Sequence, residues 1–418
     1  MSGASADRLP ELAGASVETR ASWLVASVAL VILSISYGAP LVAVVALKPI
    51  AAELGSSRSL PALAGSLAWL GSGLGGIVMG WLAERIGVRW TVMFGAVMMG
   101  AGLALSAAGG VWLLAFAHAI VIGLAGMGGI NVPLMTYVSR WFDQRRGTAL
   151  ALISSGQYVA GVVWPALFER AVAHFGWRHT MELFGALAVV AVLPLAALFL
   201  RDAPKPAGRA ASAARALSAA GIRGWHPATA FALLCLAGFL CCVPMAMPQA
   251  HLVAFCSDVG ITPAHGALML SVLLGCAFVS RQFWGWLSDR IGGLASIFVG
   301  SACQSAALAA FLLTEDETGL FTVAGFFGLG FSGIVPAYVL AICQLFPMRE
   351  AGWRVPIWFC FGLSGMAAGG WLAGVLYDYF GFYAPAFAVG VAFNIANLFV
   401  ILWLIARRRA ARLPALAA

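Results

Sequence analysis

Long apolar stretches alternate with short polar segments along the whole chain. Most of these stretches hold about 20 residues or more, which is the length that an α-helix needs to cross a ~30 Å hydrocarbon layer. Very short turns between several of them, as at Gly109–Gly110, favour antiparallel neighbours. The pattern predicts twelve spanning helices, at 22–47, 60–82, 91–109, 111–138, 147–168, 178–200, 227–255, 264–287, 294–313, 319–345, 354–377 and 382–406.

The composition agrees with a membrane protein. Hydrophobic residues make up 62% of the 418 residues and charged residues only 10%, and the mean hydropathy is +0.95. A soluble protein of this length has about 25% charged residues, and it needs them to cover its surface. We therefore expect an all-α integral membrane protein. The first apolar segment is too long for a cleaved signal and is expected to remain as a helix.

Basic residues are distributed unevenly between the segments on the two sides of the membrane. Most of the 24 Lys and Arg fall in alternate segments, and the other set holds Lys48, Arg58, Arg170 and Arg178. This bias predicts a multi-pass protein of the cell (inner) membrane with both termini in the cytoplasm. The net charge of +8 follows from the same bias, so it gives no reason to expect a nucleic-acid partner.

The longest polar segment, RDAPKPAGRAASAARALSAAGIRGW at 201–225, reads as a flexible linker between two halves. The expected organisation is a cytoplasmic tail at 1–21, a six-helix bundle at 22–200, the linker at 201–225, a second six-helix bundle at 226–406 and a basic cytoplasmic tail at 407–418.

An octapeptide occurs once in each half, as GWLAERIG at 80–87 and GWLSDRIG at 285–292, and GINVPLMTYV at 129–138 similarly resembles SGIVPAYVL at 332–340. Each octapeptide ends a helix at the predicted cytoplasmic face, where charged residues are affordable. Its first glycine permits close helix contact and its last suits a turn. A segment that only anchors the helix end at the membrane surface would have the same residues. The presence of two copies at matched positions favours the interpretation as gating loops. The gating-loop residues are Gly80, Glu84, Arg85, Gly87, Gly285, Asp289, Arg290 and Gly292.

The octapeptide resembles the loop between helices 2 and 3 of the major facilitator superfamily, and the chain after residue 20 fits the twelve-helix plan of that superfamily. RWFDQRRGTALALISSGQYVAG at 140–161 and the stretch at 251–292 resemble the monocarboxylate porter and oxalate:formate antiporter branches. The resemblance implies a monomeric secondary transporter with two pseudo-symmetric six-helix bundles, no cofactor, and partners limited to the bilayer and a small molecule.

Arg281 has no counterpart in the first half, because the repeat places it opposite Gly76. It precedes Asp289 on the same helix and lies about 12 Å from the inner boundary. A charge at this depth costs at least about 2.5–3.5 kcal/mol, and no acid at the same depth is apparent, so an anionic substrate is expected to pair with it. By the resemblance, Arg281 aligns with a carboxylate-binding Arg, although Ala277 stands where animal members have Asp.

Other polar residues at membrane depth are candidates for the same cavity, although each of them would equally suit a hydrogen bond between helices. His118 is a candidate for proton coupling because its ordinary pKa lies near 6.5, while a neutral, satisfied histidine is the alternative. The candidate substrate-binding residues are Arg281, Asn131, Tyr37, Gln157, Tyr158 and Tyr338.

These features favour a carrier of a small organic anion, with a monocarboxylate first. The alternative is a carrier of a larger amphipathic or aromatic compound, such as a drug or a vitamin-like molecule. A non-transporting sensor would be expected to add a soluble domain. An ATP-driven pump is excluded because GxxxxGK[ST] is absent. No catalytic or metal-binding constellation indicates an enzyme, and the eight cysteines read as small apolar residues. Symport, antiport and uniport all stay open.

Overall fold

The computed structural model describes residues 18–142, 145–201 and 227–416, and almost all of them are helical. The expected linker at 201–225 lies almost wholly outside the described residues, as does most of the expected tail at 1–21. No strand occurs in the described ranges, and eleven helices there are long and apolar enough to span a membrane. The protein is therefore an all-α membrane protein.

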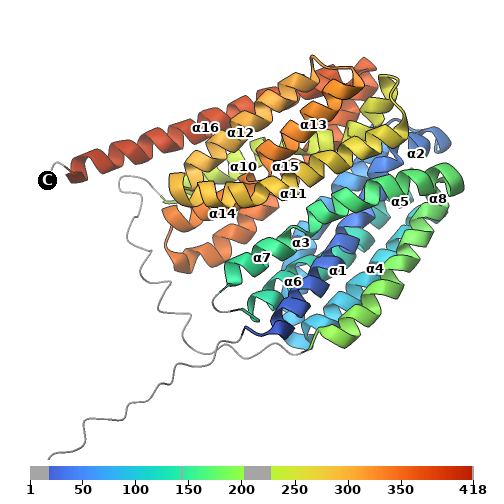
Figure 1. Ribbon diagram of the computed structural model, residues 1–418, viewed down its shortest axis with the longest axis horizontal. Helices are drawn as coiled ribbons and strands as arrows, with labels where there is room; N and C mark the ends of the chain where they lie inside the picture. Colours follow the sequence, from blue (N-terminus) through green and yellow to red (C-terminus); the bar gives the residue numbers. More distant parts are fainter. Residues whose placement is uncertain (1–17, 143–144, 202–226, 417–418) are drawn as a thin grey trace, which may run out of the picture.

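The first half holds the elements α1 (Arg20–Val45), α2 (Leu47–Glu53), α3 (Ser59–Ile86), α4 (Val88–Ala108), α5 (Val111–Phe116), η1 (Ala117–Met127), α6 (Gly128–Ser139), α7 (Arg146–Ser154) and α8 (Gly156–Phe199). The second half holds α10 (Pro227–Asp258), α11 (Pro263–Ile291), α12 (Gly293–Phe311), α13 (Glu317–Phe331), α14 (Ile334–Leu345), α15 (Met348–Phe380) and α16 (Ala384–Leu416). Arg20, Pro227 and Leu416 lie at one end of the molecule, the terminal face, and α2 lies at the other, the opposite face (Figure 1).

The expected spans recur with four local differences. The spans expected at 147–168 and 178–200 lie mainly in the long α8, where Gly176 (φ 79°) separates two antiparallel passes, so eleven helices make twelve crossings of the described chain. The span expected at 111–138 is not one α-helix, because residues 117–127 form a π-helix. The span expected at 319–345 is broken between Phe331 and Ile334. At the end of the chain, α16 continues past 406 to Leu416.

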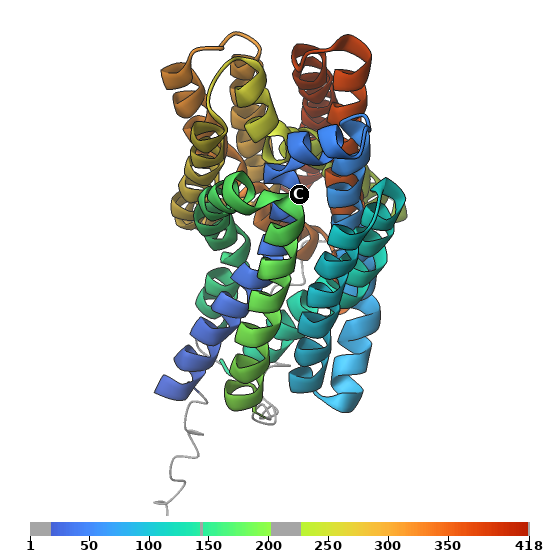
Figure 2. The same ribbon diagram turned by 90° about the vertical axis from the view of Figure 1, so that its right-hand side faces the viewer.

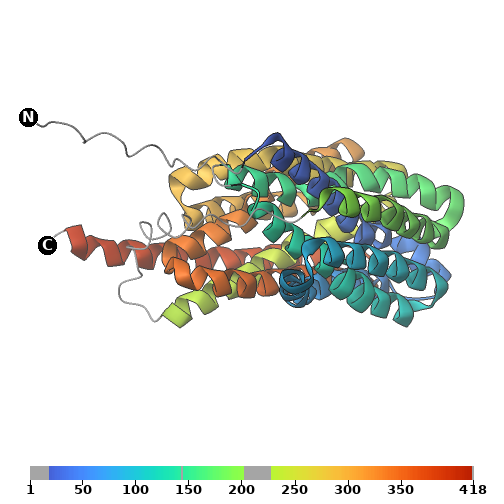
Figure 3. The same cartoon turned by 90° about the horizontal axis from the view of Figure 1, so that it is seen from below.

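The helices form two bundles, each with its own apolar core. In Figure 1, α10 to α16 lie above most of α1 to α8, and Figure 2 shows the same division; in Figure 3 the two groups overlap, with their helices running roughly along the long axis. One buried cluster runs from Val25 to Leu200 and belongs to the first half only. The other is formed by the second half, with Leu47, Ala62 and Tyr158 added from the first. These three residues therefore mark the interface between the bundles.

Glycines bring certain helices within each bundle into backbone contact. A Cβ atom on Gly71 or Gly75 of α3 would lie 2.1 or 2.0 Å from a carbonyl oxygen of η1. In the second bundle, a Cβ on Gly328 of α13 would lie 2.0 Å from the carbonyl oxygen of Leu273 on α11. No larger residue fits these positions without displacing backbone, so the helix pairs are locked closely together.

Candidate functional site

A small cavity of about 50 Å³ lies between the two bundles. Its lining comes from both halves, and includes Tyr37 and Trp69 from the first and Gln249 and Met366 from the second. The rings of Tyr37 and Trp69 stack with centroids 5.9 Å apart. This volume holds a few water molecules at most. A larger solute therefore requires the bundles to separate around it.

Arg281 lies on α11, about two helical turns from Leu274, a residue of the cavity lining. Its side chain is half-buried, and its guanidinium lies 5.3 Å from the ring centroid of Tyr158 across the bundle interface. It also interacts electrostatically with the hydroxyl of Tyr37. Among the described residues, no carboxylate forms an ion pair with Arg281. The guanidinium thus has aromatic neighbours from the other bundle but no balancing charge.

Three of the sequence-predicted substrate residues, Tyr37, Gln157 and Tyr158, belong to this region. Tyr37 and Gln157 line the cavity, and Tyr158 is buried beneath Arg281. The ring of Tyr158 also packs edge-on against Phe331 of α13, with centroids 6.2 Å apart. The structure thereby brings candidates from α1, α8 and α11 together at the interface of the bundles.

The other two candidates are engaged inside single bundles. Asn131 is buried and accepts a hydrogen bond of 2.9 Å from the Ser36 hydroxyl. Tyr338 is fully buried, donates a hydrogen bond of 2.9 Å to Asn397 and stacks on Trp358. Neither lines the cavity. Asn131 and Tyr338 thus form hydrogen bonds between helices, which is the alternative to substrate binding that the sequence left open.

His118 lies in η1 and is fully buried in the first bundle. Its Nδ1 atom lies 3.2 Å from the Ser106 hydroxyl and 3.0 Å from the Leu114 carbonyl. Its Nε2 atom has no hydrogen-bond partner among the described residues, and His118 does not line the cavity. The structure therefore places it away from Arg281 and its aromatic neighbours.

The two octapeptides take closely similar conformations at the terminal face. Gly87 ends α3 with φ 92° and Gly292 ends α11 with φ 83°, a backbone region that favours glycine. Arg85 lies over the Trp81 ring at 4.0 Å, and Arg290 lies over the Trp286 ring at 4.1 Å.

Their acidic residues differ in their contacts. Glu84 pairs with Arg140 at 3.6 Å, inside the first bundle, and both side chains are well exposed. Asp289 is exposed, and no ion pair of this residue occurs within the described part of the chain. Gly80 and Gly285 lie about one helical turn before these acidic residues. The repeated peptide thus has a repeated shape but no repeated ion pair.

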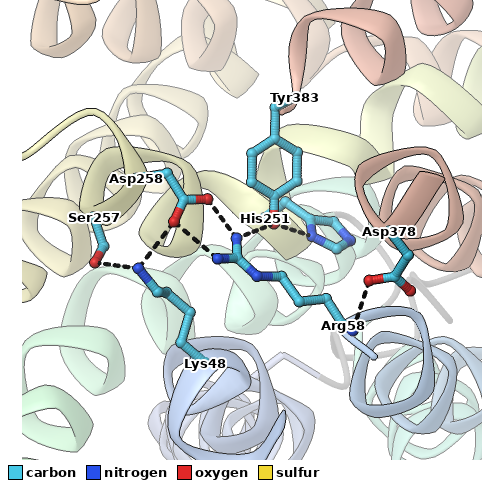
Figure 4. A network of polar contacts seen from close by, with 7 residues as sticks. All are labelled: Lys48, Arg58, His251, Ser257, Asp258, Asp378 and Tyr383. Carbon is cyan, nitrogen blue, oxygen red and sulfur yellow. Dashed lines mark hydrogen bonds and ion pairs between the residues drawn. The ribbon is translucent and has the colours of Figure 1, made fainter. Parts of the chain in front are cut away.

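A polar network that the sequence did not single out joins the two bundles at the opposite face (Figure 4). Lys48 donates to Asp258 at 2.9 Å and to Ser257 at 2.8 Å. Arg58 also pairs with Asp258, with one nitrogen–oxygen distance of 2.8 Å. We call this the opposite-face network; its residues are Lys48, Arg58, His251, Ser257, Asp258, Asp378 and Tyr383.

Asp378 contributes to the network by capping a helix of the other bundle. Its two carboxylate oxygens accept hydrogen bonds of 2.8 and 2.9 Å from the backbone N–H groups of Arg58 and Ser59, where α3 begins. These amides have no acceptor within their own helix, and the positive end of the helix dipole favours an anion there. Burial lowers the pKa of Arg58, but its hydrogen bonds to Asp258 and Tyr383 outweigh this and raise the pKa overall.

The comparisons with known proteins identify the family. The family model of the Major Facilitator Superfamily matches residues 24–314 and 234–417. The chain is 23% identical over 356 residues to the MFS-type transporter YcxA of Bacillus subtilis (strain 168), covering 82% of this chain and 86% of that protein. It is 26% identical to monocarboxylate transporter 13 of Rattus norvegicus, covering 77% and 74%. The chain is also 23% identical to MFS-type transporter 1 of Ophiocordyceps sp. (strain BCC 1869). That match covers 68% of this chain and 62% of that protein.

Two solved transporter structures illustrate the similarity of fold. A bacterial homologue of the human lysosomal transporter Spinster, inward-facing and unoccupied, superposes with a TM-score of 0.71 at 16% identity, covering 94% of this chain and 97% of that one. A peptide transporter POT in complex with sulfate gives a TM-score of 0.72 at 16% identity and covers 96% of both chains. The chain belongs to the major facilitator superfamily, a family of secondary transporters and not of enzymes.

Proposed function

We propose that the protein carries a small organic anion, a monocarboxylate first, across the membrane by alternating access, and that Arg281 binds the carboxylate. Family membership accounts for secondary transport of a small molecule through a lipid bilayer. The anionic substrate is our inference, and one observation carries it. Arg281 is a half-buried cation at the bundle interface, and the described residues supply no acid to pair with it.

The surroundings of Arg281 suit a carboxylate with a short apolar body. A guanidinium binds a carboxylate through two parallel hydrogen bonds, which a lysine does not reproduce. The adjoining cavity is lined by Tyr37, Trp69, Leu274 and Met366, with Gln157 and Gln249 as its amide groups. The similarity to monocarboxylate transporter 13, distant as it is, points the same way.

Transport by proteoliposomes tests the proposal directly. We expect one or more labelled monocarboxylates from a panel to be taken up, and Arg281→Gln and Arg281→Lys to reduce that uptake at least tenfold. The reason is that truncating one partner of a buried charge pair typically costs about 2–5 kcal/mol. Arg170→Gln is the matched control, because Arg170 is exposed on α8, away from the cavity. Normal uptake of an identified substrate by both Arg281 variants would refute the anion site.

A carrier of a larger amphipathic or aromatic compound is the second candidate, and the stacked pair of Tyr37 and Trp69 favours it. Aromatic walls bind flat apolar bodies irrespective of charge. Competition experiments distinguish the two candidates. If an aromatic carboxylate competes and its neutral amide does not, the anion site is supported. If both compete equally and Arg281→Gln changes neither, the second candidate holds.

The remaining elements of the proposal concern orientation, motion and coupling. The bias of Lys and Arg supports a location in the cell (inner) membrane with both termini in the cytoplasm. Each bundle consists of six spans in this proposal, and the linker at 201–225 connects the two bundles. We propose that the octapeptide loops act as gates at the terminal face and that the protein works as a monomer. Proton symport, anion exchange and uniport are all compatible with a cavity whose described lining holds no carboxylate.

A further inference from the structure

His251 is the histidine of the opposite-face network, and its side chain is fully buried. It lies on α10 between two groups of the second bundle (Figure 4). Its Nδ1 atom is 3.0 Å from the Tyr383 hydroxyl, and its Nε2 atom is 2.7 Å from the Gly370 carbonyl oxygen. Both ring nitrogens are therefore engaged, and neither is in contact with solvent.

These contacts fix which atoms donate. A carbonyl oxygen only accepts, so Nε2 carries a hydrogen and donates it to Gly370. In a neutral ring Nδ1 then has no hydrogen, and it accepts from the Tyr383 hydroxyl. The hydroxyl oxygen in turn accepts from the Arg58 guanidinium at 3.3 Å. Burial raises the pKa of Tyr383, so its hydroxyl keeps the proton that it donates. The bonds run in one direction, from Arg58 through Tyr383 to His251.

A proton on Nδ1 would reverse this arrangement. His251 would become a donor at both nitrogens, and Tyr383 could no longer donate to it. The hydroxyl proton would lose its acceptor inside a closed contact, which is costly for a buried group. The imidazolium would also face the guanidinium of Arg58 with a single hydroxyl between them, and like charges at this separation repel.

The other charged and titratable groups that face His251 do not offset that repulsion. Asp378 faces it from α15, where Tyr377 packs against the ring of Tyr383, and Asp258 and Lys48 lie beyond Arg58. Both carboxylates are already engaged, Asp258 by Lys48 and Arg58, and Asp378 by two amides of α3. Among the described residues, α1, α11, α12, α14 and α16 place no charged group in contact with the ring.

We propose that His251 is a proton-binding site that controls the opposite-face network: the bundles close at this face only over a neutral imidazole. When they separate there, the ring meets solvent and takes up a proton from the solution at that face. The closed conformation then binds fewer protons than the open one. By linkage, each pH unit of acidification shifts the population towards the open conformation by at most about tenfold. This proposal rests on the alternating access of the proposed function, but it does not depend on the identity of the substrate. It can therefore hold or fail independently of the role proposed for Arg281.

Hydrogen exchange followed by mass spectrometry tests this on the full-length protein in lipid nanodiscs, without any substrate. The reporters are the amides of Arg58 and Ser59, which donate across the bundles to Asp378. Exchange is compared between about pH 7.5 and about pH 5.5, after correction for the intrinsic rate. This range spans the ordinary pKa of histidine, about 6.5, and stays above that of aspartate, about 3.9. We expect protection to fall on acidification by up to about tenfold, because a ring with an ordinary pKa is mostly neutral at about pH 7.5 and mostly protonated at about pH 5.5.

Variants assign the response to His251. His251→Gln can still donate to Gly370 but does not titrate, so its protection should be independent of pH. Tyr383→Phe removes the hydroxyl that connects His251 to Arg58, and should give less than half of the wild-type response on a logarithmic scale. His174→Gln is the control, because His174 is exposed at the same face and bonded to the Arg170 carbonyl, and it should respond as wild type does.

Two outcomes of this experiment would contradict the proposal. If the wild-type protein shows no change in protection over this range, the proposal is wrong, whether or not the variants fold. The same holds if His251→Gln retains the wild-type response, because the response would then come from other groups, such as His179 or His265 at the surface.

Discussion

The two faces of the molecule use the same residue types in different ways. At the opposite face, Asp258 and Asp378 of the second bundle bind Lys48 and Arg58 of the first, with distances of 2.8 to 2.9 Å. At the terminal face, Glu84 pairs with Arg140 of its own bundle at 3.6 Å. The ion pairs of Asp258 with the first bundle thus hold the two bundles together at the opposite face. The position of an ion pair relative to the bundle interface, and not its presence, determines whether it can hold a conformation.

The largest expected effect comes from Asp258→Asn, because this change weakens the contacts of both Lys48 and Arg58. Each hydrogen bond to a charged group contributes about 1.5–3 kcal/mol, less where solvent reaches it. We expect the closed conformation to lose about tenfold to 100-fold in population. The distance between spin labels on the exposed residues Ser57 and Leu313 would report it, with unnatural amino acids as attachment sites so that the native cysteines stay unchanged.

Asp289→Asn is the matched control at the terminal face, since this carboxylate is exposed and forms no ion pair within the described residues. We expect the label distances of this variant to match those of the wild type. If both variants shift the distances alike, charge at the opposite face is not what closes it.

A smaller effect is expected from Asp378→Asn. The amide keeps one oxygen acceptor for the two N–H groups at the start of α3 and loses the charge that suits the helix dipole. Loss of a helix cap typically costs about 1 kcal/mol. Faster hydrogen exchange at Arg58 and Ser59, by about fivefold, is the expected result. Unchanged exchange would mean that the cap does not contribute to closure.

The smallest effect is expected from Glu84→Gln. This pair is exposed on both sides and joins neighbours within one bundle, so we expect a loss below about 0.5 kcal/mol. Thermal unfolding in detergent should shift by less than about 1 °C. A shift of several degrees would show that the octapeptide of the first half holds the bundle together more strongly than its geometry indicates.

Much of the fold followed from the sequence, because a helix in lipid must satisfy its backbone internally and needs a fixed length of apolar residues. The number of spans and the all-α class were confirmed on this basis. The π-helix at 117–127 was not predicted, because α- and π-helices bury apolar residues equally well and differ only in backbone hydrogen bonds. The break between Phe331 and Ile334 lies close to Pro336, whose missing N–H group cannot take part in helical hydrogen bonding.

The candidate site was less accessible to sequence reasoning. Arg281 was found because the repeat has no second copy of it, and Tyr37, Gln157 and Tyr158 lie near it as expected; their roles stay predictions. Trp69 was missed, since one tryptophan among fifteen carries no positional signal. The opposite-face network was missed because its partners lie far apart in sequence. Lys48 and Arg58 had been noted only among the few basic residues of the segments on the outer side.

The glycine contacts of Gly71, Gly75 and Gly328 have a mechanical consequence. With backbone against backbone, α3 and η1 cannot slide past each other, and neither can α11 and α13. Under the proposed alternating access, each bundle would move as a rigid body about the interface between the bundles. A helix such as α3, with its 28 residues, is about 42 Å long. A few ångströms of separation at Arg58 must then appear as an approach of similar size at Gly87, so one end cannot open without the other closing.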